Sequence, residues 1–218
     1  MNYVMAFIEK TDYDTVMGIC SELGLPMALS WSARGTALQS MRDLLGIENT
    51  KKRVICAFAS PEKTAEFIDQ LKRRIYIGVP GHGLVAAIPV KSIGGGKMAE
   101  KLKGDAESVK YKPQINYDFE VIMAVANAGR TDMVMNAARS AGAAGGTVVH
   151  AGGTGAKGEA RFMNISITGE REVIIIVTQA EKKAGIMRAI LEKAGPGTDA
   201  GAVVFSLPVS DVAGFGLK

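Results

Sequence analysis

The sequence of 218 residues aligns with itself when it is shifted by about 118 positions. Three pairs of apolar segments match in the same order: 4–8 with 122–126, 54–56 with 173–175, and 88–90 with 207–209. The last two pairs require one added residue in the second half. The order and the near-constant spacing of these matches indicate a duplicated domain, so each half must fold into a similar unit.

Each half predicts the same series of elements. Short apolar, β-prone segments indicate strands near 3–9, 27–32, 54–59 and 84–90, and again near 119–126, 147–151, 173–177 and 202–209. Apolar residues at helical spacing indicate two helices in each half. The first is opened by a capping residue, Asp14 in one half and Thr131 or Asp132 in the other, and the second begins at Pro61 or Ala180. The order β-α-β-β-α-β is that of the ferredoxin-like fold. We therefore expect an α+β protein with two four-stranded antiparallel sheets, each with its helices on one face.

The predicted domains are 1–93 and 118–218, joined by a linker at 94–117 that contains a Gly triplet and alternating lysines. Within the halves, the connections 33–51 and 152–171 are long for this fold. We expect them to be less ordered or to depend on a partner, although residues 36–45 have a helical period.

The charge distribution argues against a nucleic-acid partner. The net charge is +4, and the basic residues are spread along the chain. Only Lys51–Arg53 and Lys72–Arg74 cluster, and no aromatic residues are interleaved with them as a stacking platform would require.

The chain has no apolar run near the ~20 residues of a membrane span and no signal-peptide pattern at its start. Cys20 and Cys56 lie in apolar surroundings without CxxC spacing, which favours two core residues. We expect a cytoplasmic protein without a cofactor.

Few residues favour catalysis or metal binding. The chain has two histidines, His82 and His150, and the second belongs to the half without cysteine, so convergence on a metal is not expected. No common catalytic or P-loop motif occurs. An alternative function, a small-molecule enzyme or metal-handling protein on the same fold, has only His82, Asp199 and Arg34 as candidate residues.

Two Gly-rich segments carry a family resemblance. Residues 146–149, continued by Gly153-Thr154-Gly155, resemble the second strand and the Gly-x-Gly loop entrance of nitrogen-regulatory P-II proteins. Residues 196–201, followed by an apolar strand, resemble the Gly-rich loop before the last strand of those proteins. The resemblance covers 118–213 and extends more weakly to the first half. It implies a trimeric, ferredoxin-like signal transducer.

The resemblance also implies ligand-binding residues. In the second half they are Thr147, Gly153, Thr154, Gly155, Lys157, Gly197, Thr198, Asp199 and Gly201, and in the first half Gly35, Thr36 and His82. Backbone N–H groups in such Gly-rich turns suit a phosphate or carboxylate. Simple turns are the alternative. Asp199 would accept a ligand hydroxyl or stabilise its own turn, and for His82 an exposed loop position is favoured over a ligand contact.

The sequence also departs from the family. Ala202 stands where P-II proteins have a phosphate-binding Lys, and their basic residues after the last strand and their loop Tyr are missing. An adenine nucleotide should therefore bind weakly. We expect a non-enzymatic sensor of a small anionic metabolite or nucleotide that regulates a transporter or metabolic enzyme. It should be a homo-oligomer, with a trimer favoured by the resemblance.

Overall fold

The computed structural model describes residues 1–25, 28–36, 51–79, 82–90, 115–153, 161–162, 165–166 and 169–214. The described residues form two compact units. Unit 1 takes those of Met1–Ser32, Arg42–Tyr117 and Pro208–Lys218, and unit 2 takes those of Ala33–Met41 and Asp118–Leu207. The sequence-based boundaries at 93 and 118 remain a prediction. Most of the two long connections, including 37–45, lies outside the described residues, and so does most of the predicted linker.

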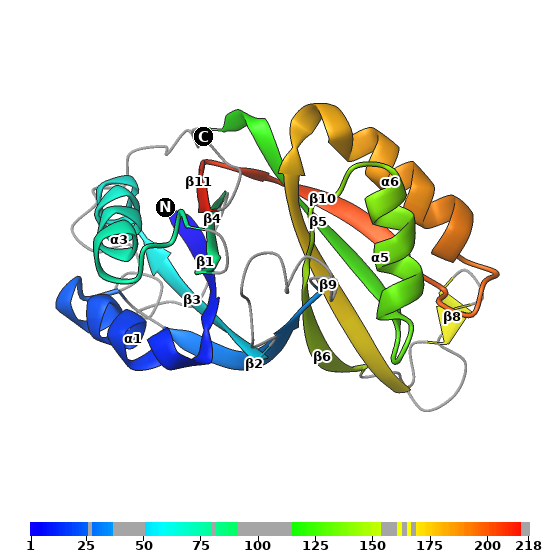
Figure 1. The fold of residues 1–218 in the computed structure, drawn as a ribbon, viewed down its shortest axis with the longest axis horizontal. Coiled ribbons are helices and arrows are strands. Elements are labelled where there is room, and N and C mark those ends of the chain that lie inside the picture. Colours follow the sequence, from blue (N-terminus) through cyan, green and yellow to red (C-terminus); the bar gives the residue numbers. More distant parts are fainter. Residues whose placement is uncertain are drawn as a thin grey trace. The chain divides into compact units, whose positions relative to one another are not determined.

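Unit 1 begins with β1 (Asn2–Glu9), a short 3₁₀ turn η1 (Lys10–Asp12) and α1 (Tyr13–Glu22). The following elements are β2 (Leu29–Gly35), β3 (Lys51–Ala59), α3 (Pro61–Arg74) and β4 (Leu84–Pro89). The strands lie in the order β2-β3-β1-β4, and β1 pairs antiparallel with both neighbours (Figure 1). The C-terminal strand β11 (Asp211–Gly214) pairs with β4 at the edge of this sheet.

The second series of elements repeats this order. It consists of β5 (Asn116–Asn127), α5 (Thr131–Ser140), β6 (Thr147–Gly153), β9 (Gly169–Gln179), α6 (Ala180–Ala194) and β10 (Val203–Val209). The strand order is β10-β5-β9-β6, the same fourth-first-third-second order as in unit 1. A small hairpin of β7 (Arg161–Phe162) and β8 (Ile165–Ser166) stands apart from this sheet. The predicted α+β fold with ferredoxin-like units is confirmed.

In each unit both helices cover one face of the sheet. Figure 1 shows α5 and α6 side by side over the strands of unit 2. Alternate strand residues pack against them, because successive side chains of a strand point to opposite faces. The unit 2 core contains Ile122, Ala124, Ile174 and Ile176 from the strands and Val134, Met135, Ile186 and Ile190 from the helices. The unit 1 core follows the same pattern, with Val4, Ala6, Ile8, Ile55, Ile19, Cys20, Phe67 and Leu71.

The helix starts were predicted with mixed success. The expected starts at Pro61 and Ala180 are confirmed, and the Ser60 hydroxyl caps α3 by accepting from the N–H of Lys63 at 3.3 Å. The cap expected at Asp14 is wrong, because η1 precedes α1 and Asp12 holds the N-cap position, which leaves Asp14 inside the first turn. Among the described helices, none combines the length and the apolar character needed to cross a membrane.

Candidate functional site

Both Gly-rich segments of the second repeat leave the same end of the unit 2 sheet. At this end Gly153, the last residue of β6, pairs with Gly169 at the start of β9. Two residues further along β9, Arg171 pairs with Asn127, the last residue of β5. The N–H of Asn127 donates to the carbonyl of Ala200 at 2.9 Å, which holds the loop between α6 and β10 against the same end.

This loop, residues 195–202, is closed by its own hydrogen bonds. The N–H and the hydroxyl of Thr198 both donate to the carbonyl of Gly195, at 3.1 and 2.8 Å. The N–H of Gly201 donates to the carbonyl of Thr198 at 3.1 Å. Gly197 and Gly201 have positive φ angles of 95° and 52°, a conformation that favours glycine. The loop is therefore a preformed turn in which the Thr198 and Gly201 donors are already used.

Ala202, which follows the loop, is fully buried in the unit 2 core. Its N–H donates to the carbonyl of Ala194 at 2.8 Å. A lysine at this position would place an ammonium group among apolar side chains, at a high desolvation cost. The structure thus assigns this position to the core of unit 2.

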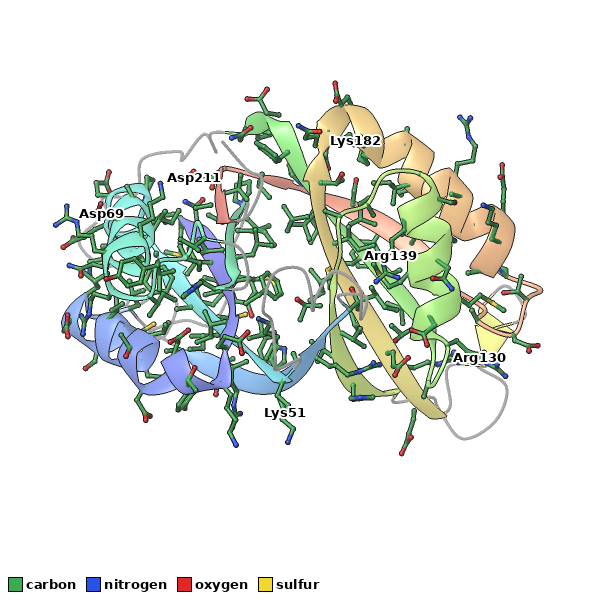
Figure 2. The ribbon with its side chains drawn as sticks, in the orientation of Figure 1. Lys51, Asp69, Arg130, Arg139, Lys182 and Asp211 are labelled. Carbon is green, nitrogen blue, oxygen red and sulfur yellow. The ribbon has the colours of Figure 1, made fainter. Side chains whose placement is uncertain are left out.

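Asp199 contacts two residues near the end of β5, Asn127 and Arg130. Its carbonyl accepts from the Nδ2 of Asn127 at 2.9 Å, and its carboxylate lies 3.4 Å from the guanidinium of Arg130. Arg130, labelled in Figure 2, immediately precedes α5 and is about half exposed. The carboxylate is thus placed beside a cation at the surface, where an exposed ion pair contributes little stability.

Arg171 is a second cation at this end that the sequence-based reasoning missed. Its side chain donates to the Oδ1 of Asn127, and the residue is only 8% exposed. Within the described residues, no carboxylate lies at ion-pair distance from its guanidinium. Buried charges are usually paired, so a guanidinium whose partner is a neutral amide is unusual. The signal that could have found it is its alignment with Lys52 in the internal repeat.

Glu172, the next residue of β9, faces the helices and is 3% exposed. Its Oε2 accepts from the N–H and the hydroxyl of Thr131, at 3.2 and 2.6 Å. The carboxylate therefore satisfies a free donor in the first turn of α5, where negative charge is favourable. Nδ1 of the exposed His150 lies 3.7 Å from the other oxygen of Glu172. The capping residue expected at Thr131 or Asp132 is thus replaced by a side chain from the sheet.

Thr147, Gly35 and Thr36 gather elsewhere in unit 2. Thr147 starts β6, at the opposite end from Gly153, and pairs with Gly35. The hydroxyl of Thr36 donates to the carbonyl of Gly146 at 2.9 Å and accepts from its N–H at 2.8 Å. These hydrogen bonds therefore hold the end of β2, the part that belongs to unit 2, against the edge strand β6. The structure does not bring these residues to the loop end of the sheet.

The carbonyl of Thr36 accepts from Arg139, in the last turn of α5 and labelled in Figure 2. The remaining candidates of the second repeat, Thr154, Gly155 and Lys157, lie outside the described residues. In unit 1, Nδ1 of the exposed His82 lies 3.1 Å from the carbonyl of Ile75, so this ring nitrogen is occupied by the backbone.

The cysteines are core residues, as predicted. Cys20 and Cys56 are free thiols that are almost completely buried, and burial raises the pKa of each to about 11. Both thiols are therefore protonated and unreactive at neutral pH. In the part of the chain that the structure describes, no group of three or more His, Cys, Asp and Glu side chains is placed to hold a metal ion.

The comparisons with known proteins concern mainly this second repeat. Residues 119–215 match the family model described as "Nitrogen regulatory protein P-II". Among solved structures, PII from Arabidopsis thaliana bound to citrate is 24% identical, over 44% of this chain and 79% of that one, with a TM-score of 0.33. A microcompartments protein from Desulfitobacterium hafniense DCB is 10% identical, over 95% and 94% of the two chains, with a TM-score of 0.25.

No curated protein sequence matches the chain. The family match begins in β5 and runs through β10 and β11, so it spans every element that builds the loop end of the unit 2 sheet. The resemblance of the second repeat is thereby confirmed, while that of the first repeat remains a prediction. The second repeat of this chain, residues 119–215, is therefore similar to the nitrogen regulatory protein P-II family.

Proposed function

We propose that this chain is a regulatory protein whose second unit binds a small anionic metabolite or nucleotide at the loop end of its sheet. The observation that carries the proposal is that Gly153, the last residue of β6, and the 195–202 loop lie at the same end of the sheet. Both segments belong to the part of the chain that matches the P-II family. Gly-rich segments that meet at one end of a sheet provide backbone donors of the kind that bind anions.

The charges at this end support an anionic ligand. Arg130 and Arg171 provide two guanidinium groups, and Asp199 provides one carboxylate. The N–H groups of Gly197, Asp199 and Ala200 have no acceptor among the described residues, in contrast to those of their loop neighbours. A guanidinium presents several donors in a plane that matches a carboxylate or phosphate.

A polyphosphate should bind weakly. Because Ala202 is buried where P-II proteins have a lysine, the phosphates of ATP would lack that cation. One charged hydrogen bond contributes about 1.5–3 kcal/mol, which is roughly tenfold or more in affinity. We expect a dissociation constant for ATP of roughly tens of micromolar or weaker.

The regulatory role and the assembly follow from the family and remain part of the proposal. The bound state would be recognised by a protein partner such as a transporter or a metabolic enzyme, in the cytoplasm. A ligand can switch such a partner only if it binds one state of the protein more tightly than the other. The chain would work as a homo-oligomer, with a trimer favoured, and without a cofactor.

The decisive experiment is a ligand screen on the purified full chain. Thermal-shift measurements with ATP, ADP, AMP and fractionated small anionic metabolites would identify ligands, and calorimetry would give their affinities. We expect stabilisation by at least one small anion. If no small anion binds, or if a candidate compound is chemically converted, the proposal is wrong, and conversion would favour the enzyme alternative.

A further inference from the structure

The last strand of each repeat is the outermost of that repeat's own four strands, and the two outer edges differ. The strands are β4 and β10, which are equivalent because 88–90 aligns with 207–209 in the internal repeat. The outer edge of β4 is paired antiparallel with β11 over residues 84–87. β10 pairs with β5, and no described strand lies on its other side. One of two equivalent edges is therefore covered by a strand in the described part of the chain.

The contacts of β11 show what such an edge accepts. Ala213 lies opposite Val85, belongs to the unit 1 core and is 5% exposed. Gly214 lies opposite Leu84, and a Cβ atom at this glycine would be 2.5 Å from Cδ1 of Leu84. Antiparallel strands are joined by backbone hydrogen bonds. The edge of β4 therefore binds a short segment through its backbone, with small side chains where the two strands are closest.

The equivalent residues of β10 are exposed. Val203 and Phe205 are 39% and 41% exposed. Their counterparts on β4 are Leu84, which is half-buried, and Ala86, which is fully buried. Val204 packs against the unit 2 core, so its two neighbours lie on the face of the sheet without helices, because successive side chains of a strand alternate. β10 therefore exposes apolar side chains at positions that are more buried in β4.

β10 also lacks the features that usually protect a free edge. Soluble proteins place lysine, another charge, proline or a bulge on edge strands that stay unpaired. Residues 203–207 include no charged residue and no proline. Pro208 has a counterpart in Pro89 at the end of β4, and that strand is nevertheless paired with β11. An uncharged edge with exposed apolar side chains indicates a place where another strand is added.

We propose that the outer edge of β10 binds an extended, uncharged segment of a partner protein as an added antiparallel strand. Recognition of this kind takes its affinity from main-chain hydrogen bonds and its specificity from alternate side chains. The inference deepens the proposed function, on which it rests for the existence of a protein partner. It adds the surface that the partner contacts and the form of the segment that is bound.

The side chains of β10 define the segment that fits. In unit 1 a valine of β11 lies opposite Ala86 and a glycine lies opposite Leu84. In unit 2 the sizes on the receiving strand are reversed, because Phe205 replaces Ala86 and Val203 replaces Leu84. Side chains directly opposite each other on two strands are in contact. We therefore expect the bound segment to have alanine opposite Phe205 and valine opposite Val203.

Two uncharged synthetic peptides test the inference on the full chain. One has the core Ser-Ser-Ala-Ala-Val, with the expected sizes, and the other has Ser-Ser-Val-Ala-Gly, with the sizes found in β11. Both are flanked by threonines and carry a fluorescent label for anisotropy titration. The first peptide should bind about threefold or more tightly than the second. It should also slow hydrogen exchange in 203–207, because an added strand protects backbone N–H groups.

Phe205→Lys should weaken binding of the first peptide about tenfold or more, because a charge on an edge strand opposes strand addition. Leu191→Lys is the matched control, since Leu191 is a 46% exposed apolar residue of α6, and this variant should bind like the natural chain. Thermal unfolding of both variants verifies that they are folded.

Three results would overturn the inference. They are the absence of binding by both peptides, equal binding by the natural chain and Phe205→Lys, and a homo-oligomer that Phe205→Lys dissociates while no peptide binds. The last result, seen by sedimentation velocity, would assign the edge to a contact between copies of the chain. The ligand screen tests the anion site independently, so each of these results leaves that part of the proposed function intact.

Discussion

The buried carboxylate of Glu172 accepts hydrogen bonds from both the N–H and the hydroxyl of Thr131, at 3.2 and 2.6 Å. The equivalent residues of the first repeat are Arg53 and Tyr13, and there the guanidinium lies 5.2 Å from the ring centre. The repeat therefore conserves the contact between the third strand and the start of the first helix, but changes its chemistry. Both contacts attach the helix to the sheet.

Glu172→Gln should lower the free energy of unfolding by about 1–3 kcal/mol, because a buried charged acceptor with two donors is replaced by a neutral amide. Chemical denaturation monitored by circular dichroism measures this change. Glu170→Gln is the matched control, since Glu170 is exposed on the same strand. Equal stability of the two variants would show that the Glu172 contact has no energetic role.

Ala202→Lys should destabilise the protein by at least about 3 kcal/mol, because the new ammonium group would be buried without a partner. It should not improve the binding of ATP. Val203→Lys serves as the control, because Val203 is the next residue of the chain and its side chain is 39% exposed. A stable Ala202→Lys variant with tighter ATP binding would contradict the assignment of this position to the core.

Thr36→Val should cost about 1–2 kcal/mol, because it removes the hydroxyl that both donates to and accepts from Gly146 and leaves a backbone N–H without its acceptor. The measurement is again the midpoint of chemical denaturation. Thr11→Val makes the same chemical change at an exposed position and should have little effect. An equal loss of stability in both variants would indicate that removal of a hydroxyl alone explains the result and that the contact with Gly146 has no energetic role.

Asp199→Asn should tighten the binding of a small anion about two- to fivefold, because it removes the carboxylate that competes for Arg130, and an exposed ion pair contributes at most about 1 kcal/mol. Calorimetry at low and high salt checks this, since screening should reduce the difference. Weaker binding by the variant would favour the alternative in which Asp199 accepts a hydroxyl of the ligand.

Asp12→Asn should increase stability at neutral pH. Burial raises the pKa of Asp12 in the folded protein, so the folded state holds this proton more tightly than the unfolded chain. Stability contributed by this group is therefore present at low pH and is lost as pH rises from the unfolded pKa through the folded one. The gain from Asp12→Asn should disappear below about pH 4. Asp14→Asn, at an exposed position of α1, should show no such pH-dependent gain.

The sequence predicted the order of the elements well because that order depends on local patterns. Apolar runs and helical spacing placed the helix starts at Pro61 and Ala180, where the structure has them. The cap expected at Asp14 was wrong because a 3₁₀ turn precedes α1, and no distinct residue pattern marks such a turn. The capping of α5 was also missed, since its acceptor, Glu172, lies 41 residues away.

In the candidate site, too, some residues could be predicted from the sequence and others could not. The Gly-rich loops and Asp199 were found from composition and spacing, whereas Arg171 was hidden between two glutamates in a charged run. Successive residues of a strand point to opposite faces, so Arg171 does not share a face with Glu170 or Glu172. Its partner, Asn127, is 44 residues away and is brought to it by the register of β5 and β9.

The sequence by itself therefore determined that the chain contains two β-α-β-β-α-β units, because periodicity and the internal repeat reflect backbone geometry that is local. Only the tertiary structure decided the pairing of the cations Lys52 and Arg171 and the burial of Ala202. Both depend on which residues, distant in the sequence, lie opposite each other on neighbouring strands. A carboxylate opposite a buried cation forms an ion pair with it, whereas an amide at that position only accepts a hydrogen bond. That choice distinguishes Glu9 with Lys52 from Asn127 with Arg171.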